Sequence, residues 1–218
     1  MSSVTRLMIA LLFWGCLGCT QNPQLQYEIG DLLVYESFEN PYGWNEYVNA
    51  AQGVDFRIQD HVFRARAWDG TFTWALNSVR HADVVIEVDV VQNSVGRDSA
   101  YGVICRASPT NNGNGYYFLI SSNGDYSIRR GAGQAVTPLV QFAGSRAVQQ
   151  GQAINHLRVA CIGDYLSLSV NGTLLAETYD SRYHTGYAGI VAGAIDDGEA
   201  DISFDEYRIW TAYTVRNE

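Results

Sequence analysis

The sequence contains no lysine: its 14 basic residues are all arginine, and they stand against 23 aspartate and glutamate residues. The formal net charge is −9 at pH 7, although only 17% of the residues are charged. An acidic chain repels the phosphate backbone, so the composition argues against a nucleic-acid partner. The same shortage of positive charge argues against electrostatic docking on anionic lipid headgroups.

An apolar run long enough to span a bilayer is also missing from the N-terminus. The run Leu7 to Trp14 falls far short of the ~20 residues that a spanning helix needs. It follows Arg6 and precedes the small residues Gly15-Cys16-Leu17-Gly18-Cys19, an order typical of a targeting signal. The stretch resembles a bacterial lipoprotein signal, although Cys16 stands where that pattern has leucine. This resemblance implies a lipid on Cys19, with Cys16 as a second choice. An ordinary secretory signal is the alternative.

We therefore predict an exported protein, anchored by lipid to the cell membrane on its extracytoplasmic side. The expected organisation is a signal peptide over 1–18, a polar tether over 19–30, one domain over 31–213 and a tail over 214–218.

Helical signals are absent from the rest of the chain, where no window sustains a 3.6-residue apolar period. Short apolar or alternating runs predict strands at 32–38, 61–68, 71–76, 83–91, 99–107, 115–122, 125–130, 156–162, 165–170, 173–178, 187–193 and 201–210. Hairpin turns are expected at Asp69-Gly70, Asn123-Gly124, Gly163-Asp164 and Asn171-Gly172. Many antiparallel strands with short connections indicate an all-β sandwich or barrel.

Cysteine is scarce, with four in the chain. If lipid occupies Cys19, then Cys105 and Cys161 remain, each within an apolar strand. In an exported protein such a pair is a candidate disulfide, and two buried free thiols are the alternative. No cluster of cysteine and histidine has the spacing of a zinc site.

The hairpin over 155–172, Asn-His-Leu-Arg-Val-Ala-Cys-Ile-Gly-Asp-Tyr-Leu-Ser-Leu-Ser-Val-Asn-Gly, resembles one found in concanavalin A-like jelly rolls. That superfamily includes laminin-G-like domains and the 3-keto-disaccharide hydrolases. The resemblance covers about residues 32–210 and implies a jelly-roll β-sandwich of two antiparallel sheets. It specifies fold far better than function.

One strand resembles the Glu-x-Asp-x-x-Glu strand of laminarinase-type glycoside hydrolases, in which the first and last carboxylates act as nucleophile and acid/base. Here it reads Glu87-Val88-Asp89-Val90-Val91-Gln92. Gln92 cannot donate a proton as an acid does, so hydrolysis of this type is disfavoured. The alternative is a strand with its acids on the solvent side. No catalytic residue is predicted.

Aromatic and arginine side chains provide the best indication of ligand binding. The candidate ligand-binding residues are Trp44, Glu87, Asp89, Arg106, Tyr117 and Arg129. Aromatic side chains that only fill the core are the alternative. We expect Trp74 and Trp210, which lie inside strands, to belong to the core. The resemblance also implies that a structural calcium ion could bind acids such as Glu36 and Asp205; no other cofactor is expected.

Three functions remain open at this point. The first is a tethered binding module for carbohydrate or a cell-surface partner protein. The second is a glycan-active hydrolase similar to the 3-keto-disaccharide hydrolases, which would need ionisable groups that converge in the concave groove. A pocket that holds Glu87 or Asp89 beside Arg106 would favour it. The third is a structural envelope lipoprotein.

Overall fold

A computed structural model describes residues 25–94, 96, 99–110, 112–133, 135–195 and 198–215. These residues form fifteen β-strands and one 3₁₀ turn, Ala50–Gln52. The strands are β1 (Tyr27–Glu36), β2 (Tyr47–Asn49), β3 (Val54–Gln59), β4 (Val62–Trp68), β5 (Phe72–His81), β6 (Val84–Gln92), β7 (Ser99–Ala107), β8 (Gly115–Ser121), β9 (Asp125–Ala132), β10 (Ala135–Gly144), β11 (Ile154–Ile162), β12 (Tyr165–Val170), β13 (Thr173–Tyr179), β14 (Gly186–Ala194) and β15 (Glu199–Thr214). Within the described ranges, no helix has the length and apolar character needed to cross a membrane.

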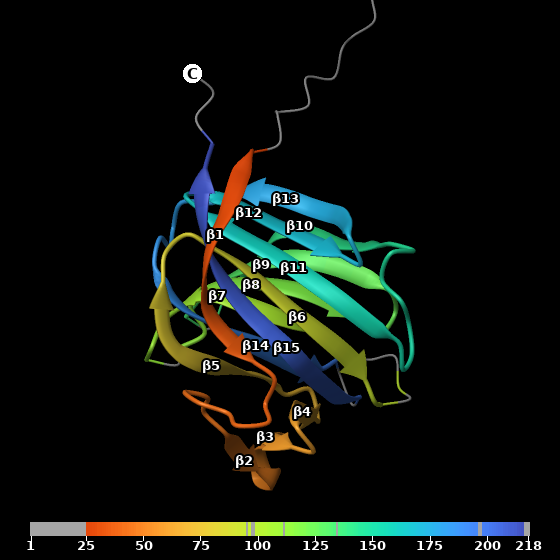
Figure 1. Ribbon diagram of the computed structural model, residues 1–218. Helices are drawn as coiled ribbons and strands as arrows, with labels where there is room; N and C mark the ends of the chain where they lie inside the picture. Colours follow the sequence, from red (N-terminus) through yellow and green to blue (C-terminus); the bar gives the residue numbers. More distant parts are fainter. Residues whose placement is uncertain are drawn as a thin grey trace, which may run out of the picture.

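Two antiparallel sheets are stacked face to face (Figure 1). The nine-stranded sheet has the order β13-β12-β11-β6-β15-β4-β3-β2, and β1 pairs with the second half of β15. The six-stranded sheet has the order β10-β9-β8-β7-β14-β5. The predicted all-β sandwich of two antiparallel sheets is confirmed.

Strand alternation places one set of side chains between the sheets. On β6, Val88 and Val90 point into the core, and on β7, Tyr101 and Val103 do so from the opposite sheet. Cys105 on β7 and Cys161 on β11 form a disulfide that joins the two sheets across this core. The predicted cysteine pair is confirmed.

Three strands that the sequence analysis did not expect are present: β2, β3 and β10. β10 contains Pro138, which has no N–H to donate and therefore suits an edge strand. β1 also begins at Tyr27, inside the segment expected to be tether, because it pairs with β15 as far as Thr214. The two ends of the described domain therefore lie side by side (Figure 1).

Three of the four predicted hairpin turns connect paired strands: Asn123-Gly124, Gly163-Asp164 and Asn171-Gly172. Asp69-Gly70 is also a tight turn with positive φ at both residues, 57° and 69°. It does not close a hairpin, because β4 and β5 belong to different sheets. A turn dipeptide fixes the local reversal of the chain but not the partner of the strand that follows.

The signal peptide over 1–18 and the first half of the tether, residues 19–24 with Cys19, lie outside the described residues. Lipidation and export remain predictions.

Candidate functional site

The six-stranded sheet carries a second apolar layer on the face turned away from the core. Along β8, Tyr116 and Phe118 belong to the core, whereas the alternating residues Tyr117 and Leu119 belong to a separate cluster on the opposite face. Trp74 packs against that cluster from β5, the edge strand of the sheet. This outer face therefore ends in an aromatic margin along β5.

A pocket of about 530 Å³ opens beside this margin, between β5 and the segment that contains β2 and the 3₁₀ turn. We call it the edge pocket. It is lined by Asn45, Glu46, Tyr47, Gln52, Val54, Thr71, Phe72, Thr73, Trp74, Ala75, Leu76 and Pro109.

Local backbone contacts hold the pocket's second wall in place. Trp44 forms an isolated antiparallel bridge with Asn77 of β5, so the segment that follows runs along the edge of the six-stranded sheet. The 3₁₀ turn then ends at Gly53, whose φ of 69° favours glycine. A Cβ at Gly53 would also lie 2.6 Å from the Trp68 carbonyl oxygen. This reversal places Gln52 in the pocket wall.

Two aromatic side chains of the pocket, Phe72 and Trp74, have one supporting residue in common. The Tyr117 ring packs 5.9 Å from the Phe72 ring and 6.2 Å from the Trp74 ring, the latter edge to face. Tyr117 is buried, and its hydroxyl donates to the Gly113 carbonyl at 2.9 Å. Burial raises the pKa of Tyr117 to about 12, so this hydroxyl remains protonated. Tyr117, predicted to bind ligand, lies behind the two rings and fixes their position.

Polar groups surround these aromatic rings. Glu46 accepts a hydrogen bond from the Ile58 amide at 2.7 Å through Oε1. Tyr47 donates to the Gln52 side chain and accepts from Asn49. Asn45 is exposed, and within the described residues its side chain makes no hydrogen bond. The pocket thus combines flat apolar faces with amide, carboxylate and hydroxyl groups.

The structure places Trp44 and Trp74 differently from what the sequence analysis expected. Trp44 packs at the margin of the core against Phe38 and Tyr207, with ring centroids 5.4 and 5.0 Å away. Trp74, expected in the core, lines the edge pocket. Trp210, also expected there, packs in a cluster on the outer face of the nine-stranded sheet, apart from the core. Both tryptophan expectations for the core were wrong, because strand alternation turns these side chains outward.

A second pocket, of about 390 Å³, follows along the same sheet, and Pro109 lines both pockets. We call it the arginine pocket. It is lined by Arg80, Arg106, Ala107, Ser108, Pro109, Asn114, Tyr183, Thr185, Gly186 and Tyr187.

The predicted ligand residue Arg106 forms part of this wall but is fully engaged within the protein. Its side chain is 1% exposed. The guanidinium donates to the carbonyls of Gly163 at 2.6 Å, Tyr183 at 2.8 Å and Ala82 at 3.3 Å, and it pairs with Asp83 at 3.1 Å. Arg106 therefore connects three loops, those that contain Ala82 and Asp83, Gly163, and Tyr183.

Arg129 pairs in register with Tyr117 and lies on the same outer face, with its guanidinium 5.4 Å from the centre of the Phe142 ring. Burial lowers the pKa of Arg129. It lies on β9, which three strands separate from β5, and it lines neither of the two pockets described above.

The two acids of the laminarinase-like strand lie on the outer face of the nine-stranded sheet. Glu87 pairs with Arg158 at 3.1 Å and accepts a hydrogen bond from the Trp210 indole, while Asp89 pairs with His156 at 2.8 Å. Gln92 is buried and donates to backbone carbonyls of the following loop. Neither acid lies beside Arg106, which belongs to the other sheet.

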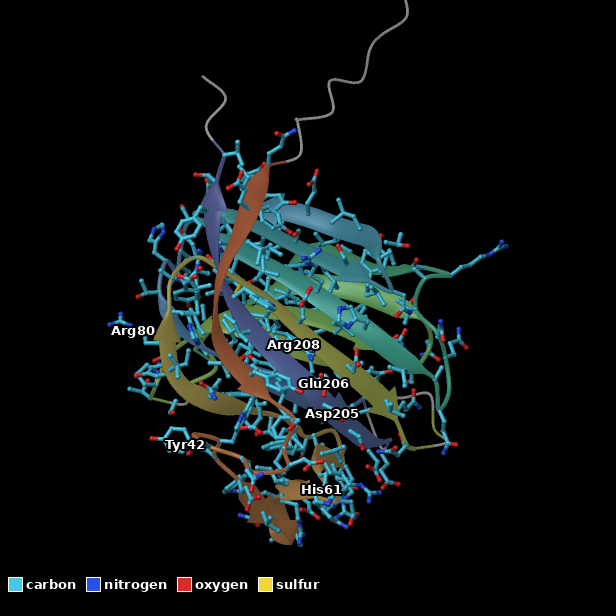
Figure 2. The ribbon with its side chains drawn as sticks, viewed as in Figure 1. Tyr42, His61, Arg80, Asp205, Glu206 and Arg208 are labelled. Carbon is cyan, nitrogen blue, oxygen red and sulfur yellow. A yellow bond between two sulfur atoms is a disulfide. The ribbon has the colours of Figure 1, made fainter. Side chains whose placement is uncertain are left out.

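The two acids proposed for calcium are bound to different backbone groups. Glu36 accepts from the amides of Phe38 and Tyr42 at 2.9 and 3.0 Å. Asp205 accepts from the Glu206 amide and lies on β15, on the outer face of the nine-stranded sheet (Figure 2). Burial, with the nearby carboxylates of Glu206 and Asp89, raises the pKa of Asp205. In the part of the chain that the structure describes, no three His, Cys, Asp or Glu side chains are grouped to hold a metal ion.

The chain has the concanavalin A-like jelly-roll fold. Three solved structures similar to it are the carbohydrate-binding module CBM66 from Bacillus subtilis, a Bacillus subtilis protein of unknown function with a galectin-like fold, and the Bacillus licheniformis β-glucanase. Their identities are 18%, 12% and 11%, and their TM-scores 0.62, 0.63 and 0.56. The matches cover 79%, 88% and 84% of this chain and 96%, 100% and 98% of the other chains.

No family model matches the sequence, and no curated protein matches it. At these identities the similarity to solved structures shows the fold alone, so function must be argued from the site.

Proposed function

We propose that this domain is a carbohydrate-binding module whose ligand lies in the edge pocket. The observation that carries the proposal is the lining of that pocket, in which Trp74, Phe72 and Tyr47 stand among amide, carboxylate and hydroxyl groups. Sugar rings present apolar C–H faces and a rim of hydroxyls, so they suit aromatic faces bordered by such groups. The names of two structurally similar proteins, a carbohydrate-binding module and a β-glucanase, agree with this chemistry.

Exposure of the aromatic rings supports a binding role for the pocket. Phe72 is 37% exposed and Tyr47 is 46% exposed, so each ring offers a free surface. Tyr117 holds Phe72 and Trp74 from behind. A pre-positioned apolar surface reduces the ordering cost of binding.

The pocket favours binding over hydrolysis. Glu46 is the one carboxylate in its lining, and one of its oxygens is engaged by the Ile58 amide. Glycoside hydrolysis by an acid–base mechanism uses two carboxyl groups flanking the bond that is cleaved.

The test is glycan-array binding by the purified protein, followed by calorimetry on the strongest hit. We expect Trp74→Ala to weaken binding at least tenfold, which corresponds to about 1.4 kcal/mol. Tyr213→Ala is the matched control, because Tyr213 is 57% exposed at the far end of β15, on the other sheet. Equal binding by wild type and Trp74→Ala, or a blank array, would leave a protein partner or a structural role as the better account.

We also propose that the domain is displayed outside the cell on a lipid attached to Cys19. The proposal rests on the targeting signal. The Cys105–Cys161 disulfide supports it, because such bonds persist in oxidising compartments. Metabolic labelling with a fatty-acid analogue should mark the wild type and not Cys19→Ala. Labelling of both proteins would refute attachment at Cys19, and labelling of neither would leave a secreted domain.

A further inference from the structure

The arginine pocket is electrostatically unlike the rest of this protein. The chain carries a net charge of −9, yet the lining of this pocket contains two arginines and no aspartate or glutamate. Its other polar groups are hydroxyls and the Asn114 amide. An anion is therefore the ligand that this pocket suits.

Arg80 supplies the accessible charge. Its guanidinium is exposed and donates to the Thr185 hydroxyl at 2.6 Å. Arg80 takes part in none of the ion pairs found among the described residues. Figure 2 shows Arg80 at the side of the sandwich, where β5 forms the sheet edge. Most of its donors therefore remain available to a ligand.

Arg106 adds a fixed charge to the wall. Its buried guanidinium donates to three carbonyls and has one carboxylate partner, Asp83, whose side chain is 47% exposed. Those contacts hold Arg106 in place and leave the direct contact with ligand to Arg80. The Asp83 carboxylate offsets part of the Arg106 charge, so Arg80 supplies the larger share of the attraction for an anion.

The two pockets are placed to receive one extended ligand. Trp74 and Arg80 lie on the same strand, opposite Val191 and Tyr187 of β14, and Pro109 lines both pockets. β5 has a register shift between them, and the stretch of β14 that faces it, four residues long, spans roughly 13 Å. A ligand that touches both pockets is therefore longer than a single sugar ring.

We propose that the arginine pocket recognises an anionic substituent, a carboxylate or a sulfate, on the glycan that occupies the edge pocket. This inference rests on the proposed function and narrows it to acidic oligosaccharides. Arginine matches the paired oxygens of a carboxylate or a sulfate through parallel N–H donors.

The experiment is an array that contains neutral, uronate- or sialate-bearing and sulfated oligosaccharides, probed with wild type and three variants. The variants are Arg80→Gln, Arg146→Gln and Trp74→Ala. Arg146 is exposed, lies outside both pockets and gives the same change in net charge. We expect anionic glycans to be the strongest hits and Arg80→Gln to weaken them at least tenfold, while Arg146→Gln binds as wild type does. Raising the salt concentration should weaken wild-type binding to the same glycans.

The outcomes separate the two proposals. Neutral glycans bound as well as anionic ones, with loss in Trp74→Ala and none in Arg80→Gln, would overturn the anionic subsite and leave the edge pocket standing. Loss of binding in Arg80→Gln without loss in Trp74→Ala would overturn the edge pocket as the binding site and leave an anion site at the arginine pocket alone. Equal loss of binding in Arg80→Gln and Arg146→Gln would show that only the net charge of the protein matters, and it would overturn the inference. Comparison of the carboxylated and sulfated sets identifies which anion is recognised.

Discussion

Opening the Cys105–Cys161 disulfide should remove a large part of this domain's stability. The bond joins β7 of the six-stranded sheet to β11 of the nine-stranded sheet, and the two cysteines are 56 residues apart in sequence. In the chain-entropy description, a cross-link that closes a loop of this length stabilises the fold by about 4 kcal/mol, because it restricts the unfolded chain. Small domains have unfolding free energies of only ~5–15 kcal/mol, so the loss is substantial.

The assay is urea unfolding of the oxidised protein, of the same protein refolded under reducing conditions, and of the Cys105→Ala/Cys161→Ala variant. Both cysteines are fully buried, so the variant also leaves cavities and should be somewhat less stable than the reduced wild type. The reduced protein therefore isolates the cross-link, and the variant adds the packing loss. If oxidised and reduced proteins had unfolding free energies within about 1 kcal/mol, the entropic argument would be refuted.

Three further predictions concern single buried positions. His81 is 5% exposed, and burial lowers its pKa from 6.5 to about 4. The unfolded chain therefore binds more protons between these pH values, and the unfolding free energy should fall by up to ~3 kcal/mol as the pH is lowered from 7 to 4. His81→Phe should flatten this pH dependence, and His184→Asn, at an exposed position, should not. Equal slopes in the wild type and both variants would show that His81 does not cause the dependence. Gly189→Ala should cost about 2 kcal/mol in thermal unfolding, because its Cβ would lie 2.0 Å from a β5 carbonyl oxygen, whereas Gly144→Ala, with its nearest neighbour at 3.4 Å, should be nearly neutral. Arg106→Lys should lose on the order of 3 kcal/mol, because one ammonium cannot serve three carbonyls and a carboxylate in that geometry. If Arg106→Lys were as stable as the wild type, the loops would not depend on the hydrogen bonds of the Arg106 guanidinium.

The candidate site depends on side chains that hold its lining residues in place. Tyr117 positions Phe72 and Trp74, and Arg106 holds the loops around the second pocket. Substituting Tyr117 or Arg106 would disturb the local structure, so the proposed functions are tested at lining residues such as Trp74 and Arg80.

The sequence by itself determined the fold class and most of the strands. Alternation on β4, β6 and β12, together with turns such as Asn123-Gly124 and Asn171-Gly172, is a local signal set by backbone geometry. The cysteine pair could be anticipated because both residues fell inside apolar strands of a chain whose N-terminal sequence predicts export.

Only the tertiary structure decided which aromatic side chains face a pocket. Alternation divides a strand into two faces but does not say which face meets the other sheet, so Trp74 was expected in the core and Trp44 at a ligand. Asp69-Gly70 likewise specified a turn but not that β4 and β5 part into different sheets. The edge pocket brings residues 45–52 beside β5, and the arginine pocket brings Arg80 beside Thr185. Such contacts join distant parts of the chain, and they arise only when the two sheets pack together.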